Sequence, residues 1–272
     1  MGLLQRGWEF FKNPKAYVDD KIKAALDREF LRLGLQSIEQ ISAEDIIIVG
    51  YPKSGNTWFQ NLTTSLLLEM NPGNLPDALA QDIVPDVHAR LYYKRYFPQM
   101  FFKSHHFPQP AYKKVVYLVR DGRDALVSYY AMNKNRGIDA NLEEMITKGK
   151  HTFPGKWGDH ARQWLQNPYE AEMIVIKYED LLIAPLESLK KFCDFAGLDR
   201  SEATLQQAIQ GNAFDRMKVK EKQLGPYNQL MNAKGNFLRK GKTGSYLEEM
   251  PPDLQRYFEQ EAGDMLQHFG YQ

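Results

Sequence analysis

The feature that most constrains this chain is a short apolar run that leads into a loop with glycine and lysine, Ile46-Ile47-Ile48-Val49-Gly50-Tyr51-Pro52-Lys53-Ser54-Gly55-Asn56-Thr57-Trp58. The run predicts a buried strand, and the residues from about Thr57 onward predict a helix. Backbone N–H groups at a helix start point at an anion, and the helix dipole favours negative charge there. Glycine lets the backbone approach a ligand because it has no Cβ. The stretch therefore predicts an anion-binding loop.

This loop almost matches the Walker A pattern, G-x-x-x-x-G-K-[ST]. Gly50 and Gly55 have the right spacing, but Asn56 stands in the lysine position and the lysine of the loop is Lys53. In that pattern the lysine after the second glycine reaches the β- and γ-phosphates. We therefore expect a phosphate-bearing ligand other than ATP. An ordinary strand–helix turn with an exposed lysine is the alternative for this stretch alone.

The composition indicates a globular protein and excludes several classes. The chain has 272 residues, 43% hydrophobic and 25% charged residues, and a net charge of +1, so no whole-molecule field favours nucleic acid. It contains no apolar run long enough for a transmembrane helix and no secretory signal. The single cysteine, Cys193, cannot form a disulfide within the chain. We expect a cytoplasmic location.

Four apolar runs alternate with helical patterns and predict an α/β fold. The strands are expected at about 46–49, 100–104, 115–119 and 173–177. Apolar strands that alternate with helices indicate a parallel sheet with helices on both faces. We found no linker or repeat, so residues 1–272 are predicted to form a single domain. Residues 1–42 show helical spacing, and we expect them to cover the core; a membrane-surface anchor is the less favoured alternative.

Polar side chains follow each predicted strand, where the ligand of such a sheet binds. They are Lys53, Lys103 with His105, Arg120 and Tyr178. His105 is a candidate general base, because a neutral imidazole takes a proton near pH 7 and its position two residues after Lys103 puts both on one side of an extended chain. Arg120 and Ser128 could bind one phosphate together. Lone residues of these types are more often structural or at the surface. We expect no metal, since two adjacent histidines and a distant cysteine do not form a zinc set.

In their order and approximate spacing, these motifs resemble those of the cytosolic-type sulfotransferases that use 3′-phosphoadenosine 5′-phosphosulfate (PAPS), over about residues 45–245, and look most like bacterial members. Six segments carry the resemblance: the loop Tyr51–Trp58, Lys103-Ser104-His105, Arg120 with Ser128, Tyr178-Glu179-Asp180, Phe214-Asp215-Arg216-Met217, and Phe237-Leu238-Arg239-Lys240-Gly241. The resemblance implies PAPS as donor, 3′-phosphoadenosine 5′-phosphate (PAP) as product, and no metal.

The resemblance also implies roles for individual residues. Lys53, Lys103 and His105 are implied to be catalytic. The other residues implied to bind the donor, besides Lys53, are Ser54, Gly55, Asn56, Thr57, Trp58, Arg120, Ser128, Tyr178, Phe214, Met217, Phe237, Leu238, Arg239, Lys240 and Gly241.

The chain departs from the family pattern at several positions. Asn56 replaces a threonine, Asn212-Ala213 replaces a hydroxyl pair, and Ser245-Tyr246 replaces Asp-Trp. We expect Asn56 to preserve donor binding through its backbone N–H, whereas the side-chain contacts at 212–213 are open. The short dimerisation motif of many animal members is not recognisable, so the oligomeric state stays open.

Sulfuryl transfer from PAPS to a hydroxyl or amine of a small molecule is the predicted function. The alternatives are a P-loop small-molecule kinase that uses ATP and Mg²⁺, and a non-catalytic nucleotide-binding protein. We expect a phenolic or otherwise hydroxylated acceptor, with a sugar or a lipid headgroup still open. Aromatic residues that could line an apolar acceptor pocket are Tyr92, Tyr93, Tyr96, Phe97, Phe107, Tyr130 and Trp157.

Overall fold

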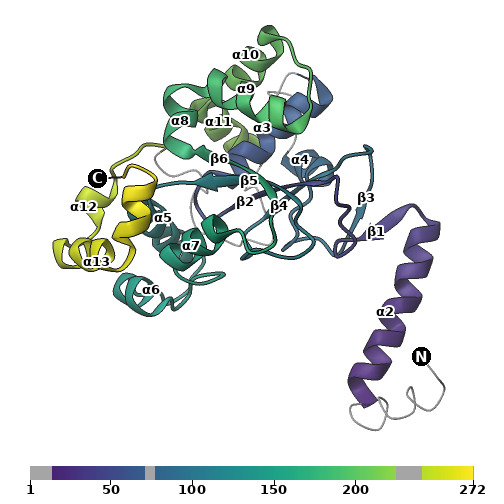
Figure 1. The fold of residues 1–272 in the computed structure, drawn as a ribbon, viewed down its shortest axis with the longest axis horizontal. Helices are drawn as coiled ribbons and strands as arrows, with labels where there is room; N and C mark the ends of the chain where they lie inside the picture. The colour runs from purple at the N-terminus through teal and green to yellow at the C-terminus, as the bar shows by residue number, and fades with distance from the viewer. Residues whose placement is uncertain (1–13, 71–76, 225–240, 272) are drawn as a thin grey trace.

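The computed structural model describes residues 14–70, 77–224 and 241–271, and its centre is a four-stranded parallel sheet (Figure 1). The order across this sheet is β4-β2-β5-β6. The strands are β2 (Ile46–Gly50), β4 (Phe101–Ser104), β5 (Lys114–Val119) and β6 (Glu172–Lys177). All three pairings are parallel, with Ile48 opposite both Lys103 and Val116. The predicted α/β class with a parallel sheet is confirmed.

Alternation along β2 divides the core into two parts. Ile46 and Ile48 belong to one buried cluster, whereas Ile47 and Val49 belong to the other. Successive side chains of a strand point to opposite faces, so a strand that is apolar throughout must be covered on both sides. This explains why a continuous run of isoleucine and valine occupies a central position of the sheet.

Helices cover both faces of the sheet. The first cluster contains Trp157, Trp164 and Phe258, from the group of helices below and to the left of the sheet in Figure 1. These helices are α5 (Gly122–Asn135), α6 (Leu142–Lys148), α7 (Trp157–Gln166), α12 (Tyr246–Glu249) and α13 (Pro252–His268). The second cluster contains Leu62 and Phe192, from the upper helices. The upper helices are α3 (Asn56–Leu68), α4 (Asp77–Ile83), α8 (Tyr178–Ile183), α9 (Pro185–Ala196), α10 (Glu202–Gly211) and α11 (Phe214–Leu224).

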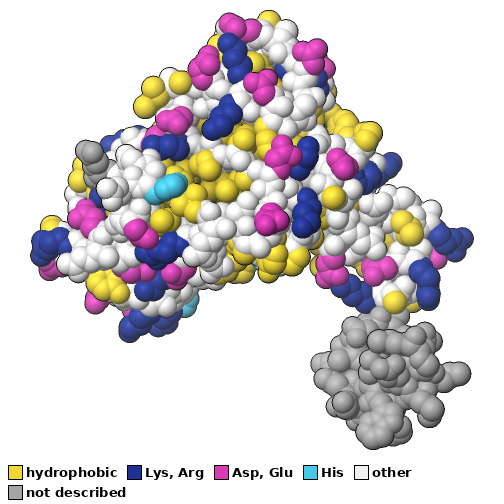
Figure 2. All heavy atoms as spheres, in the orientation of Figure 1, with side chains coloured by type: hydrophobic (Ala, Val, Ile, Leu, Met, Phe, Trp, Pro, Cys, Tyr) yellow, Lys and Arg dark blue, Asp and Glu magenta, His cyan; other side chains and the backbone are white. Residues whose placement is uncertain are grey.

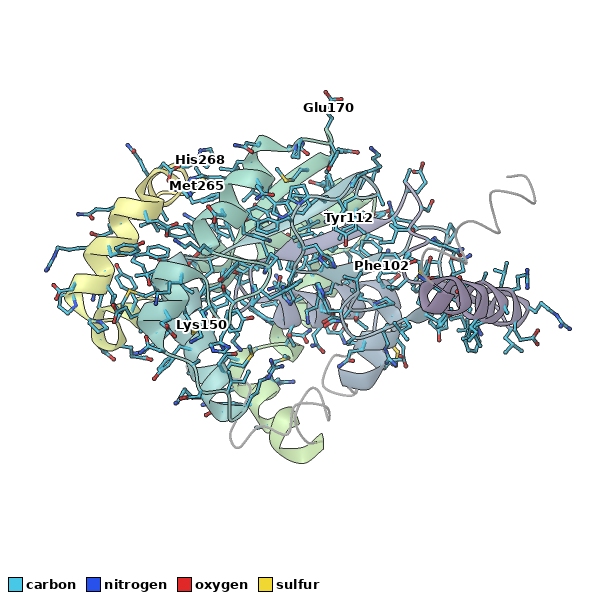
Figure 3. The ribbon with its side chains drawn as sticks, turned by 90° about the horizontal axis from the view of Figure 1, so that it is seen from below. Phe102, Tyr112, Lys150, Glu170, Met265 and His268 are labelled. Atoms are coloured by element: carbon cyan, nitrogen blue, oxygen red, sulfur yellow. The ribbon has the colours of Figure 1, made fainter. Side chains whose placement is uncertain are left out.

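The side-chain view separates interior from surface. Phe102 and Tyr112 lie within the body of the molecule, whereas Glu170 points away from it (Figure 3). Phe102 is fully buried and Tyr112 is 5% exposed. On the face drawn in Figure 2, acidic and basic side chains are interspersed, and no block of one sign stands out.

The N-terminal helix differs from our expectation. Helix α2 (Pro14–Arg32) projects away from the sheet (Figure 1). Ile22, Leu26 and Leu31, three of the residues whose spacing predicted a covering helix, are 54%, 45% and 58% exposed. The described part of this helix therefore does not cover the core. Its periodicity is real, but periodicity does not specify what a helix face packs against.

Contacts at the C-terminal half of α2 attach it to a small second sheet. Strands β1 (Leu35–Ser37) and β3 (Tyr92–Lys94) pair antiparallel. The Tyr92 hydroxyl donates to Asp27 over 2.9 Å, and its ring lies 4.4 Å from that of Phe30. Residues 77–98, which lie between the first two predicted strands, thus contribute both α4 and β3.

Candidate active site

The predicted anion-binding loop lies between β2 and α3, as the sequence indicated. Gly55 has φ +92°, a left-handed conformation that favours glycine, and a Cβ there would lie 2.8 Å from the Tyr178 ring. Lys53 also has a positive φ, of +74°. The Asn56 amide donates to the Tyr51 carbonyl over 3.0 Å and so closes the loop on itself. The side chain that replaces the expected threonine therefore has a structural role inside the loop.

A cavity of about 520 Å³ opens at the carboxyl ends of the strands. The predicted donor-site residues on its wall are Lys53, Gly55, Asn56, Thr57, Trp58, Arg120, Ser128, Tyr178, Phe214, Met217 and Gly241. Lys103 and His105 line the same cavity. Ser54 is buried within the loop but is not part of the cavity wall. Predicted donor-site residues 237–240 (Phe237, Leu238, Arg239 and Lys240) lie outside the described part of the chain.

Trp58 and Tyr178 form an aromatic wall beside the loop. Their rings meet edge-on with centroids 5.9 Å apart. The Trp58 indole N–H donates to the Asn212 carbonyl over 2.9 Å, and the Asn212 amide donates to the Ser65 hydroxyl over 3.0 Å. The Asn212 side chain thus links the end of α10 to α3, and the Asn212 carbonyl holds the Trp58 indole in place.

Arg120 is buried at the end of β5 and joins three parts of the chain. Its guanidinium donates to the carbonyls of Lys53 and Lys242, each over 3.1 Å, and lies over the Tyr178 ring with 4.5 Å to the centroid. It also lies 3.6 Å from the Asp124 carboxylate. These contacts hold a cation between the loop and the segment after Gly241, where an anion would meet it.

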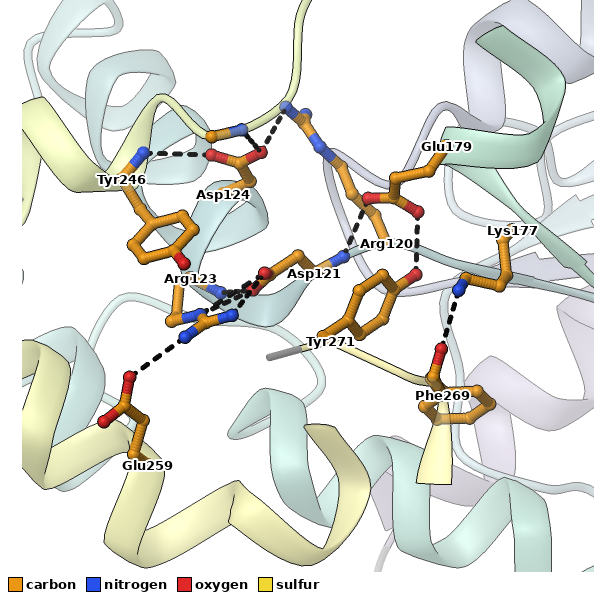
Figure 4. Close-up of polar contacts among 11 residues, drawn as sticks. Arg120, Asp121, Arg123, Asp124, Lys177, Glu179, Tyr246, Glu259, Phe269 and Tyr271 are labelled. Carbon is orange, nitrogen blue, oxygen red and sulfur yellow. Dashed lines mark hydrogen bonds and ion pairs between the residues drawn. The ribbon is translucent and has the colours of Figure 1, made fainter. Parts of the chain in front are cut away.

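A polar network behind the cavity fixes the start of α5 (Figure 4). The Asp124 carboxylate accepts from the backbone N–H groups of Gly244 and Tyr246 over 2.8 and 3.0 Å. Arg123 pairs with Asp121 over 2.8 Å, and its guanidinium lies 4.1 Å from the Tyr246 ring centroid. The replacement of Asp-Trp at 245–246 therefore leaves the backbone attachment to Asp124 in place.

The C-terminal residues complete this network (Figure 4). The Glu179 carboxylate accepts from the Tyr271 hydroxyl over 2.7 Å and from the Asp121 backbone N–H over 3.2 Å. Burial raises the pKa of Glu179, and these hydrogen bonds oppose that rise. Lys177 donates to the Phe269 carbonyl over 2.7 Å. The end of the chain thereby ties the β6–α8 junction to α5.

His105 lies just beyond β4 with one ring nitrogen engaged. Its Nδ1 is 2.6 Å from the Gly50 carbonyl oxygen. A carbonyl can only accept, so Nδ1 carries the proton and Nε2 keeps its lone pair. Burial, followed by the charge of Lys103, lowers the pKa of His105 well below its ordinary value, and the Gly50 bond and Asp86 oppose this. The neutral imidazole can therefore take a proton at Nε2.

Sequence reasoning missed two residues beside this histidine, Asp86 and His88. Asp86 pairs with Lys103 over 2.8 Å, and the Nε2 of His88 accepts from the backbone N–H of His105 over 2.9 Å. The His88 and His105 rings are stacked, 5.4 Å apart. The D-x-H spacing at 86–88 repeats the K-x-H spacing at 103–105 and was the available signal. We overlooked it because this stretch lacked a strand pattern.

The rest of the cavity wall corrects our acceptor-pocket prediction. None of Tyr92, Tyr93, Tyr96, Phe97, Phe107, Tyr130 and Trp157 lines this cavity. Trp157 and Tyr93 are instead core residues. The wall away from the loop contains Ala89, Tyr129, Met132, Arg136 and Phe153. Tyr129, Met132 and Arg136 follow helical spacing along one side of α5, but that pattern could not show which side would face the cavity.

The donor end of the cavity has chemistry that fits a phosphate-bearing ligand. Among the described residues, buried polar atoms without a hydrogen-bond partner include Ser54 Oγ, Arg120 Nε and Ser245 Oγ. Buried polar groups normally have partners; Arg120 and Ser245 line the cavity and Ser54 belongs to its loop, so these donors point to a ligand that accepts hydrogen bonds. Within the same described ranges, no group of three or more His, Cys, Asp or Glu side chains is arranged to hold a metal ion.

Comparison with known proteins gives consistent matches. Residues 43–270 match the family described as "Sulfotransferase domain". Human sulfotransferase 2B1 is 29% identical over 85% of this chain and 73% of its own length, and mouse sulfotransferase 1B1 is 28% identical over 79% and 80%.

Solved structures show the same fold at lower identity. Mouse sulfotransferase SULT7A1 complexed with PAP is 19% identical with a TM-score of 0.62, covering 85% of this chain and 87% of that one. Retinol dehydratase in complex with androsterone and PAP is 21% identical with a TM-score of 0.62, covering 83% and 81%. None of the described helices is long and apolar enough to span a membrane.

Proposed function

The chain belongs to the sulfotransferase domain family, and from this premise we propose how it carries out PAPS-dependent sulfuryl transfer to a hydroxyl or amine of a small molecule. The observation that carries the proposal is the convergence of Lys53, Lys103 and His105 on one cavity, which Arg120 and Ser128 also line. A base, two cations and a phosphate site from four separate segments are the parts that this reaction needs.

The loop and its surroundings would hold the donor. Backbone N–H groups at the start of α3 would bind the 5′-phosphosulfate, as expected of a helix N-terminus. Arg120 and Ser128 would bind the 3′-phosphate, and Trp58 with Phe214 would pack on adenine. Solved relatives with this fold contain PAP, which supports the assignment. PAPS supplies the sulfuryl group: the acceptor oxygen forms a bond to sulfur, the bond from sulfur to the 5′-phosphate breaks, and its electron pair leaves with PAP.

His105 would act as the general base. Because Gly50 fixes the proton on Nδ1, Nε2 is the atom that takes the proton of the acceptor hydroxyl. Lys53 and Lys103 would stabilise negative charge on the bridging and sulfuryl oxygens, as preorganised cations do in related transfers. Every group required on the protein side is thus a side chain already on the cavity wall.

The wall beyond His105 indicates the acceptor class. Tyr129, Met132 and Phe153 present apolar surface, and Arg136 adds a cation directly after the last residue of α5. The acceptor we propose is a small hydroxylated molecule with an apolar body, phenols included, and an anionic group on it would find Arg136. Retinol dehydratase, which shares the fold, binds androsterone and retinol, which are alcohols with apolar bodies.

A kinase reading finds little support. Asn56 occupies the position of the Walker lysine, and its side chain is engaged with Tyr51. The non-catalytic alternative does not explain why Lys103 and His105 line the same cavity.

The direct test is transfer of radiolabelled sulfate from PAPS to a panel of phenols, aliphatic alcohols and amines. We expect sulfated product from at least one acceptor when PAPS is the donor. In a parallel assay with ATP and Mg²⁺ as the donor, we expect no phosphorylated product. Turnover with ATP–Mg²⁺ and none with PAPS would overturn the proposal. Tight PAP binding without transfer to any acceptor would favour the non-catalytic alternative. The single-domain organisation of residues 1–272 and the cytoplasmic location stay predictions, which limited proteolysis and cell fractionation would check.

A further inference from the structure

Residues 85–88 form an additional edge beside β4. Asp86 pairs with Lys103 as an isolated parallel bridge. The Lys103 N–H donates to the Pro85 carbonyl over 2.9 Å, and the Val87 N–H donates to the Lys103 carbonyl over 3.0 Å. Backbone hydrogen bonds therefore hold this short segment against the strand that carries the proposed base.

This pairing places two short patterns side by side. Asp86 and His88 are two residues apart, as are Lys103 and His105, and the chain turns at residues 87–89 directly after the bridge. All four line the cavity. Asp86 Oδ2 is 2.8 Å from Lys103 Nζ, and Asp86 Oδ1 accepts from the His88 backbone N–H over 2.9 Å. The Asp86 carboxylate is thus fixed at both oxygens next to the base.

We propose that Asp86 is a positioning residue for sulfuryl transfer, whose carboxylate orients Lys103 and offsets the positive charge that His105 gains with the acceptor proton. This inference rests on the proposed function. In the transfer step the hydroxyl proton moves to His105 Nε2 and makes an imidazolium beside Lys103, another cation. Two like charges at one site are unfavourable, and a carboxylate within the same cluster reduces that cost.

The charges around His105 support this role. Its titratable neighbours are Lys103 from β4 and Asp86 and His88 from the added edge, while His160 of α7 interacts with its backbone. Burial and then Lys103 lower the pKa of His105, while Asp86 raises it. Burial lowers the pKa of His88 to about 4, so His88 is neutral and adds no competing charge near pH 7. Asp86 is therefore the one anionic side chain in this described cluster.

The pKa of Asp86 itself shows that the carboxylate stays charged. Burial alone would raise it, but Lys103, then His105 and the His88 backbone N–H, hold the pKa of Asp86 below its ordinary value. Asp86 is consequently ionised near neutral pH, where its carboxylate faces the neutral His105 imidazole.

The test is Asp86→Asn, with Asp86→Glu as the conservative variant. Asp82→Asn is the matched control, because Asp82 pairs with Arg90 at the exposed surface of the same region. We expect Asp86→Asn to lower kcat roughly tenfold, since a weaker base transfers protons more slowly. At the same time, the acid limb of its kcat profile should move to lower pH, because loss of the carboxylate lowers the pKa of His105. Asp86→Glu should keep part of the kcat and of the acid limb position that Asp86→Asn loses. Asp82→Asn should change neither kcat nor the acid limb.

A titration of the His105 imidazole by NMR in the PAP complex gives a readout besides activity. The pKa of His105 should be lower in Asp86→Asn than in the wild type. The effect of Asp86→Asn on the pKa of His105 should also be measured in a Lys103→Met background. In the double variant, neutral residues replace both members of the Asp86–Lys103 pair. If Asp86 only balanced Lys103, the further Asp86→Asn change would leave the His105 titration unmoved, which would overturn the proposal. An unshifted acid limb in Asp86→Asn would overturn it too. Failure of the proposed function is distinguishable, because the wild type would then transfer no sulfate.

Discussion

The two ends of the cavity are held in place by different means. At the donor end, backbone atoms fix the side chains: Trp58 donates to the Asn212 carbonyl, and Arg120 donates to the carbonyls of Lys53 and Lys242. At the acceptor end, the wall depends on side chains such as Arg136, and on Phe153, which is 42% exposed. A site fixed by backbone is built for one ligand, whereas a wall that includes exposed side chains such as Phe153 is more easily altered. Substitutions at the two ends should therefore affect different constants.

The largest effect is expected where the two ends meet. His105→Ala removes the base, and we expect kcat to fall by about 10²–10⁴-fold. PAP affinity, measured by calorimetry, should stay within about twofold, because general acid–base catalysis acts on the transition state and not on donor binding. His106→Ala is the control, since that side chain does not line the cavity. Near-wild-type turnover of His105→Ala would contradict the base assignment.

Arg120→Ala tests the donor end. Hydrogen bonds to charged groups contribute about 1.5–3 kcal/mol, so PAP should bind roughly 10- to 100-fold more weakly. The affinity for AMP, which lacks the 3′-phosphate, should fall much less, and the KM of the acceptor should hardly change. A thermal unfolding measurement separates this effect from lost contacts to Lys53 and Lys242. Equal losses for PAP and AMP would show that Arg120 does not bind the 3′-phosphate.

Gly55→Ala tests whether the loop depends on close packing. The new Cβ would lie 2.8 Å from Tyr178 at φ +92°, whereas Gly137 has φ +75° and nothing within 4 Å of a Cβ. Both alanines bear the left-handed cost of about 1–2 kcal/mol. Gly55→Ala should destabilise the protein further and weaken PAP binding, while Gly137→Ala should leave PAP affinity unchanged. Identical melting temperatures and affinities would mean that the Tyr178 contact is unimportant.

Arg136→Gln is the smallest and most selective change. A partly exposed ion pair contributes up to about 1 kcal/mol, so the KM of an acceptor with a carboxylate should rise about fivefold. The matched neutral acceptor and PAP should be unaffected. The measurement is a set of KM values for the acceptor pair in both proteins. A similar rise for the neutral acceptor would remove Arg136 from acceptor recognition and leave the acceptor end purely apolar.

Local patterns were enough to predict the scaffold of the donor end. The apolar runs at 46–49 and 115–119 became β2 and β5, because a strand buried on both faces leaves a continuous hydrophobic signature. Lys53, Arg120 and Ser128 follow predicted strands at set distances, and they line one cavity. Their assigned roles stay predictions until the variants are measured.

The acceptor end was beyond the reach of these patterns. We chose Tyr92 and Trp157 as pocket residues by composition alone; Tyr92 contacts α2, and Trp157 is a core residue. Asp86 was missed because it joins β4 through an isolated bridge and not through a strand of its own. Local patterns were also insufficient for α2, because its apolar spacing indicated a helix but not the surface against which that helix packs.

By itself, the sequence determined the parallel sheet, the loop between β2 and α3 and the family to which the chain belongs, because each depends on residues close together along the chain. Only the tertiary structure decided which side of α5 faces the cavity and that Asp86 lies beside Lys103. These facts depend on contacts between segments that chain connectivity leaves free, such as Asp86 and Lys103, which are 17 positions apart in the sequence. The proposed base thus came from a local motif, and its proposed counter-charge from packing.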